Sequence, residues 1–189
     1  MTVLFRISVL FLLSAAFAAA QTGFRNSVVF TGGSARDVNA FCCETETALS
    51  LGITYGYRPV AHLQLEAGLT AALSSAPEIR GANYDIRPAD RFFWVPFGAR
   101  GILPVSGGRV ELSLSGGGLY EKYQVSNPAS VVGLVSRDGW GGYLAGGAAL
   151  AIDRSRHFWL GVSPHWFMAN AGNARDRWLV IAGDFGFRF

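Results

Sequence analysis

The chain has 189 residues, of which 24 are Gly, 13% are aromatic and only 15% are charged. This length suits one domain or one small barrel, and few charges with many aromatic residues exclude a disordered chain. The formal net charge is +3 and the pI is about 9.1, but Lys122 is the only lysine and no basic run occurs, which excludes a typical nucleic-acid-binding protein.

Residues 1–20 have the features of an export leader. Arg6 precedes an apolar run from Ile7 to Leu13, and small residues follow up to Ala20. The run is too short to span a bilayer comfortably, and the small residues end in an A-x-A cleavage site. We therefore expect a signal peptide cleaved after Ala20, which leaves residues 21–189 as the exported domain.

Eight later segments alternate apolar and polar side chains with the period of two that is typical of β-strands. Most have about twelve residues, more than the usual five or six and enough to cross a bilayer at a tilt. In chain order they are Asn26–Gly33, Glu46–Tyr57, Ala61–Ala71, Phe92–Leu103, Arg109–Tyr123, Gly139–Ile152, His157–Met168 and Trp178–Phe189.

The polar stretch between Ala71 and Phe92 is predicted to be a loop. In the Gly-rich segment 139–152 the parity is ambiguous, and we assign Leu144, Gly146, Ala148, Leu150 and Ile152 to the apolar face. The connections after the second, fourth and sixth strands are short, and the others are longer and more polar. Bacterial outer-membrane barrels have the same asymmetry, with short periplasmic turns and long external loops.

Alternation alone does not say which face points outward, because a soluble ligand-carrying barrel shows the same period. The distribution of aromatic residues favours a membrane barrel. They gather at strand ends, as two membrane interfaces require, and leave aliphatic residues in between. The predicted belts are Tyr55, Tyr57, Phe158, Phe187 and Phe189 at the short-turn end, and Phe93, Tyr120, Trp140, Trp166 and Trp178 at the loop end.

The opposite faces of the strands carry charges of both signs. Eight strands enclose an interior just wide enough for side chains, so opposite charges facing inward can pack as a hydrogen-bonded network. The predicted lumen network is Glu46, His62, Glu66, Arg100, Arg109, Glu111, Asp184 and Arg188.

Together with the phrases VPFGARGIL, WLGVSPHW and the closing FGFRF, these features look like the small OmpA-like and OmpX-like outer-membrane proteins. The resemblance covers essentially all of residues 21–189 and implies an all-β, eight-stranded, antiparallel, up-and-down transmembrane β-barrel. It implies that Phe185, Phe187 and Phe189 form the signal read by the barrel-assembly machinery. The usual signal also has a glycine several residues before the terminal Phe, and neither Gly183 nor Gly186 falls at that position.

Two local features have alternative interpretations. The adjacent Cys42 and Cys43 could form a strained vicinal disulfide, a soft-metal site or an intermolecular link, or have no role. Ser163 lies two residues before His165 on the same inward parity, and outer-membrane lipid A deacylases use Ser, His and an acid on such a barrel. The expected pattern is His-x-Ser, but here His165 is followed by Trp166 and Phe167, and no acid is identifiable. We therefore assign no catalytic residue, cofactor or metal.

The sequence therefore predicts an integral protein of the bacterial outer membrane, with both termini in the periplasm and a structural or surface-interaction role through its exposed loops. Its expected partners are outer-membrane lipids, the barrel-assembly machinery and an unidentified extracellular ligand. The alternatives are a hydrolase of lipid A or phospholipid and a narrow pore, the latter disfavoured because eight strands leave a filled lumen.

Overall fold

The computed structural model describes residues 24–38, 47–75, 79–81, 84–86, 89–126, 135–171 and 174–189. The predicted leader, the Cys42–Cys43 pair and the lumen candidate Glu46 lie outside these ranges. Within the described ranges, no helix is long and apolar enough to cross a membrane.

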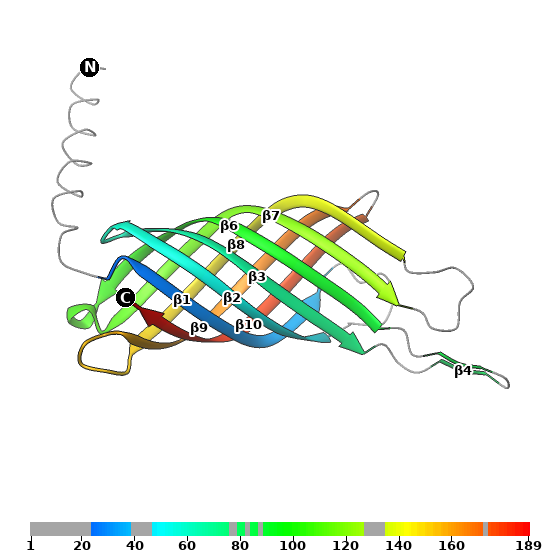
Figure 1. The fold of residues 1–189 in the computed structure, drawn as a ribbon, viewed down its shortest axis with the longest axis horizontal. Coiled ribbons are helices and arrows are strands. Elements are labelled where there is room, and N and C mark those ends of the chain that lie inside the picture. The colour runs from blue at the N-terminus through cyan, green and yellow to red at the C-terminus, as the bar shows by residue number, and fades with distance from the viewer. Residues whose placement is uncertain are drawn as a thin grey trace, which may run out of the picture.

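Eight antiparallel strands close into a barrel, in the order β1-β10-β9-β8-β7-β6-β3-β2 (Figure 1). This confirms the predicted up-and-down architecture, since every barrel strand pairs with its neighbours in sequence. The barrel strands are β1 (Asn26–Asp37), β2 (Thr47–Val60), β3 (Leu63–Ser75), β6 (Ala89–Val105), β7 (Val110–Ser126), β8 (Val135–Ala151), β9 (Phe158–Ala171) and β10 (Ala174–Arg188).

Closure joins the first strand to the last, as predicted. The β1–β10 ladder runs from the Ser27–Arg188 pair to the Asp37–Trp178 pair. Beyond it, the backbones of Asn26 and Phe189 exchange hydrogen bonds of 2.9 and 3.0 Å. Both sides of the closing strand are therefore paired, and the barrel has no open edge there.

The two ends of the barrel differ. The turn end carries the connections β2–β3, β6–β7 and β8–β9 and also the last residue of the chain, whereas the loop end carries the longer connections (Figure 1). The β6–β7 turn contains a short 3₁₀ segment, η2 (Ser106–Gly108). The prediction of a plain loop between Ala71 and Phe92 is wrong, because this stretch extends β3 and β6 and forms a separate hairpin of β4 (Ile79–Gly81) and β5 (Tyr84–Ile86).

The apolar face of every barrel strand points outward. On β2, Leu49, Leu51 and Ile53 are 60%, 56% and 43% exposed, while Ala48 and Ser50 between them are buried. On β8, Leu144 and Leu150 are exposed, which confirms the parity assigned to that strand. A barrel with this outer surface would be insoluble in water, so the soluble-carrier alternative does not fit the fold.

One member of the predicted aromatic belts is misplaced. Trp178 is 1% exposed and lies inside the barrel, whereas Trp140 and Trp166 are on the outer surface as expected. The reason is parity, because Trp178 alternates with the outward Leu179 and Ile181 along β10. By the same alternation, the side chains of Val180 and Ala182 also point inward and are buried.

Glycines permit close approach of strand backbones where β6 meets β7. Gly98 pairs with Gly117, and a Cβ atom on either residue would overlap the backbone of the opposite strand. Close packing of the two strands therefore explains Gly117 within the Gly116–Gly118 run.

Candidate functional site

The candidate site is the lumen, where inward side chains form three layers between the turn end and the loop end. Strand periodicity selects these side chains, because every second residue of a strand points into the barrel. Some of their partners come from across the barrel, such as Arg58 and Arg188 for Glu111, and others from the adjacent strand, such as Arg100 for Glu66. Among the described residues, no group of three or more His, Cys, Asp or Glu side chains could hold a metal ion.

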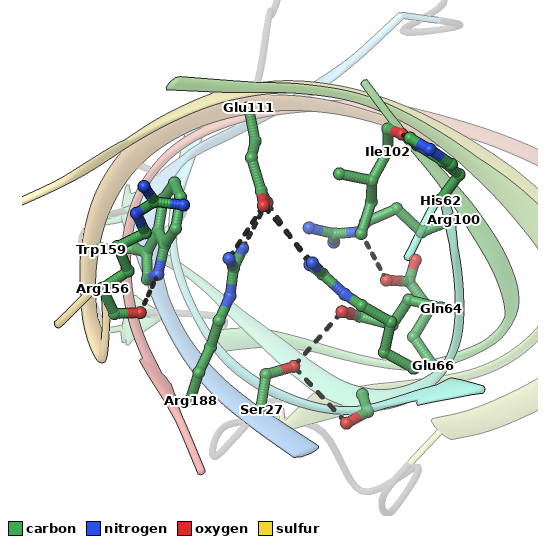
Figure 2. A network of polar contacts seen from close by, with 12 residues as sticks. Ser27, His62, Gln64, Glu66, Arg100, Ile102, Glu111, Arg156, Trp159 and Arg188 are labelled. Carbon is green, nitrogen blue, oxygen red and sulfur yellow. Dashed lines mark hydrogen bonds and ion pairs between the residues drawn. The ribbon is translucent and has the colours of Figure 1, made fainter. Parts of the chain in front are cut away.

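The layer nearest the turn end is centred on Glu111 of β7, which is buried. Arg188 of β10 approaches it with both terminal nitrogens, one of them 2.9 Å from Oε1. Arg58 of β2 donates to the same carboxylate at 3.4 Å, so two guanidinium groups share the carboxylate that Figure 2 shows beside Arg188. Such two-pronged pairs fix the geometry of the strands that carry them.

An aromatic ring extends this first layer. The guanidinium carbon of Arg188 lies 3.8 Å from the ring centroid of Trp159, a cation–π geometry. The Trp159 indole N–H donates to the backbone carbonyl of Arg156 at 2.7 Å. Trp159 therefore connects the lumen to the β8–β9 turn.

The middle layer contains two polar groups. In one, Arg100 Nε lies 2.7 Å from Glu66 Oε2, and the Tyr143 hydroxyl donates to Glu66 Oε1 at 2.8 Å. In the other, the Ser163 hydroxyl donates to Asp184 Oδ1 at 2.9 Å and lies 2.8 Å from Nε2 of His165. Between this layer and the first is a cavity of about 50 Å³, which has room for a few water molecules.

The layer nearest the loop end is mainly aromatic. The ring centroid of Trp178 is 4.5 Å from that of Phe92 and 5.6 Å from that of Trp94, and Trp94 also packs on Phe167 at 5.0 Å. Trp94 donates its indole N–H to Glu121 at 2.7 Å, and this carboxyl group has no exposed surface.

An ion pair lies beside this aromatic cluster. Arg137 donates to both carboxylate oxygens of Asp176 at 2.8 and 2.9 Å, and its guanidinium carbon lies 4.4 Å from the ring centroid of Tyr123. Arg137 comes from β8 and Asp176 from β10, so the pair spans β9 between them. A single nitrogen of Arg137, Nη2, makes both contacts, and the ion pair ties β8 to β10 at the loop end.

The structure brings together five of the eight residues predicted for the lumen network: Glu66, Arg100, Glu111, Asp184 and Arg188. The other described candidates are placed differently. His62 and Arg109 lie in or beside the turns and are exposed, because the strands end there. His62 contacts the carbonyl of Ile102 at 3.1 Å (Figure 2).

Several lumen residues were missed from the sequence. Arg58 lies just beyond the end predicted for the second strand, Glu46–Tyr57, and Tyr143 lies on the strand whose parity is ambiguous. Trp94 and Glu121 share the inward parity of Arg100 and Glu111 on the same strands, and that signal could have identified both. The ion pair of Arg137 and Asp176 was missed because both residues fall in stretches expected to be loops.

The Ser163 cluster lacks the arrangement of a catalytic triad. In a triad the acid orients the imidazole, which in turn takes the proton of the serine. Here the Asp184 carboxylate accepts from the Ser163 hydroxyl itself. The cluster also lies at mid-lumen, beside the Glu66–Arg100 layer, so an acyl chain of a membrane lipid has no direct route to it.

The fold is shared with solved outer-membrane proteins. Neisserial surface protein A matches with a TM-score of 0.60 at 12% identity, over 87% of this chain and 97% of that one. Ail, the attachment invasion locus protein of Yersinia pestis, matches with a TM-score of 0.57 at 11% identity, over 87% and 100%. OprG from Pseudomonas aeruginosa matches with a TM-score of 0.55 at 14% identity, over 90% and 99%.

These likenesses establish the fold and confirm the resemblance to small outer-membrane barrels at that level. No protein-family model matches the sequence, and neither does any curated protein sequence.

Proposed function

We propose that this chain is an integral outer-membrane barrel with a structural or surface-interaction role, which it performs through the connections at its loop end. The outer surface carries the argument. Large apolar side chains are exposed on all eight strands, while Glu66, Arg100, Glu111 and Arg188 form ion pairs inside the lumen. Only a lipid environment makes that distribution stable, because it removes the outer face from water.

The filled lumen argues against a pore. The Glu66–Arg100 pair occupies the middle, and the rings of Trp94 and Trp178 occupy the loop-end half, where each is at most 1% exposed. The cavity of about 50 Å³ lies on the turn-end side of these layers. Conduction would require the aromatic layer to open, so the pore remains the weaker alternative.

The geometry of Ser163, His165 and Asp184 likewise gives the hydrolase alternative little support. The Asp184 carboxylate accepts a hydrogen bond from the Ser163 hydroxyl, whereas in a catalytic triad it would accept one from the histidine. A role at the cell surface needs no chemistry in the lumen. It needs a rigid barrel that holds its loops outward, and continuous ladders between neighbouring strands provide one.

The membrane assignment is tested by fractionating cells and running the outer-membrane fraction on a detergent gel with and without boiling. We expect the protein in that fraction, with a band that shifts on boiling because the folded barrel resists the detergent. Recovery as a soluble periplasmic protein would refute the proposal.

The orientation is tested with an epitope tag. A tag inserted between Gly107 and Gly108 should be hidden from antibody on intact cells, because we place that turn and both termini in the periplasm. The same tag inserted after Pro128, between β7 and β8, should be accessible. The reverse pattern would invert the orientation.

Assembly by the barrel-assembly machinery is part of the same proposal. Phe185, Phe187 and Phe189 share one face of the closing strand, and Phe187 stacks on Phe189 with ring centroids 5.7 Å apart. Phe189→Ser should lower the amount of folded barrel in the membrane without altering the stability of the molecules that do fold. The matched control is Phe30→Ser, on the outer face of β1. Equal yields for the two variants would contradict the assigned role.

A further inference from the structure

The turn end of the barrel is hollowed into a vestibule of about 450 Å³. It lies on the outer side of the Glu111 layer, between the turns, and its size is that of pockets that take small molecules. Its lining combines arginine side chains with apolar ones.

The lining is strongly positive, with five arginines and a single carboxylate, Glu111. Arg58 and Arg188 both bind that carboxylate. No carboxylate of the described residues pairs with the other three arginines, which are Arg25, Arg154 and Arg156. Asp153 lies next to them in sequence, but its side chain accepts from Ser155, His157 and Phe158 within the turn.

The backbone holds one of these arginines across the vestibule. Arg156 has a left-handed φ of 61°, and its carbonyl is fixed by the indole of Trp159. Its guanidinium lies against the β6–β7 turn, where a Cβ atom on Gly108 would come within 2.8 Å of Nη1. A side chain from the β8–β9 turn therefore reaches the neighbouring turn, and Gly108, with a φ of 80°, leaves the room for it.

We propose that this vestibule binds a phosphate-bearing anion. Arginine forks match phosphate oxygens, and the unpaired positive charge calls for more than one negative charge on the ligand. Apolar side chains, among them Phe24, Val60 and Pro104, form part of the same wall. The site therefore suits a phosphate attached to an apolar group, either the headgroup of an anionic phospholipid or a soluble phosphate compound. The inference is independent of the role proposed for the loop end.

The first arm of the test measures binding of inorganic pyrophosphate to the purified, folded barrel in a non-ionic detergent, by calorimetry at about 0.15 M salt, where long-range attraction between exposed charges is screened. The test variant is Arg154→Gln/Arg156→Gln, which leaves the Glu111 layer intact. We expect the wild type to bind and the double variant to lose roughly tenfold or more in affinity. The heat-dependent gel shift verifies that each variant is folded.

The matched control is Arg109→Gln. Arg109 is exposed at the same end of the barrel but does not line the vestibule. We expect this variant to bind pyrophosphate within about twofold of the wild type, because long-range attraction between exposed charges is largely screened. A loss in Arg109→Gln as large as in the double variant would indicate a diffuse positive surface and overturn the proposal.

The second arm separates the two sources of phosphate. Native mass spectrometry of the barrel with phosphatidylglycerol should show retained lipid in the wild type and less in Arg154→Gln/Arg156→Gln, with phosphatidylcholine as the zwitterionic control. Retention of phosphatidylglycerol would identify a lipid headgroup, and binding of pyrophosphate alone would identify a soluble ligand. The absence of wild-type binding in both arms would overturn the proposal.

Discussion

The turn-end half of the lumen is filled by Glu111 and two arginines, whereas the loop-end half is filled by Phe92, Trp94 and other aromatic rings. The charged half borders an open vestibule, so its ion pairs keep part of their contact with water. The aromatic half is sealed, because Trp94 has no exposed surface. The two halves therefore have different roles: the aromatic rings close the lumen, and the ion pairs connect strands that are not adjacent in the barrel.

The largest expected effect comes from emptying the aromatic half. Trp178→Ala should destabilise the barrel by about 3–5 kcal/mol, because it removes a fully buried ring from a packed cluster. The measurement is equilibrium unfolding in urea with the protein in detergent micelles. Trp140→Ala, on the outer surface, is the control and should cost far less. Similar losses for both would show that the aromatic layer is not a packed core.

The next effect comes from the charged half. Glu111→Gln should cost about 3 kcal/mol in the same unfolding experiment, because two arginines lose a shared, largely buried carboxylate. The double variant Glu111→Leu/Arg188→Met should recover part of the loss, since it removes the repulsion between the two guanidinium groups. A double variant as unstable as the single one would mean that the arginines do not depend on Glu111.

A smaller effect is expected at mid-lumen, where the two halves meet. Ser163→Ala removes the hydroxyl between His165 and Asp184 and should cost about 1–3 kcal/mol, because it leaves buried polar groups unpaired. Ser50→Ala, at a buried serine on β2, is the control. Mass spectrometry of lipid A and phospholipids from cells with each variant should show no difference. A lipid change confined to Ser163→Ala would revive the hydrolase alternative.

The smallest effect is expected at the rim of the charged half. Some desolvation opposes ionisation of Asp153, but the Phe158 N–H, the Ser155 hydroxyl and the His157 N–H outweigh it and lower the pKa of Asp153 from its ordinary 3.8 to about 2. A lowered pKa means that the ionised group stabilises the fold above about pH 4, and that this contribution disappears as the pH falls to 2. The difference between the unfolding midpoints of wild type and Asp153→Asn should therefore be larger at pH 5 and shrink steadily as the pH falls towards 2. A gap that is constant with pH would contradict the role of the charge.

Some of this arrangement was accessible from the sequence. The inward direction of Glu66 and Arg100 follows from strand parity alone, since both alternate with apolar residues. The error at Trp178 had a different origin: its position near a strand end was weighed above its parity. The short β4–β5 hairpin gave no signal, because its strands have three residues each and alternation cannot be recognised over so short a length.

The sequence by itself determined the number of barrel strands and the direction of their faces, because side-chain alternation is a local property of an extended backbone. The tertiary structure decided which side chains meet. Glu111 and Arg188 are 77 positions apart and come from non-adjacent strands, so their contact depends on the tilt and register with which the barrel closes. The same closure gathers arginines from β2, from β10, from the β8–β9 turn and from the residue before β1 around one vestibule, which no single strand pattern could reveal.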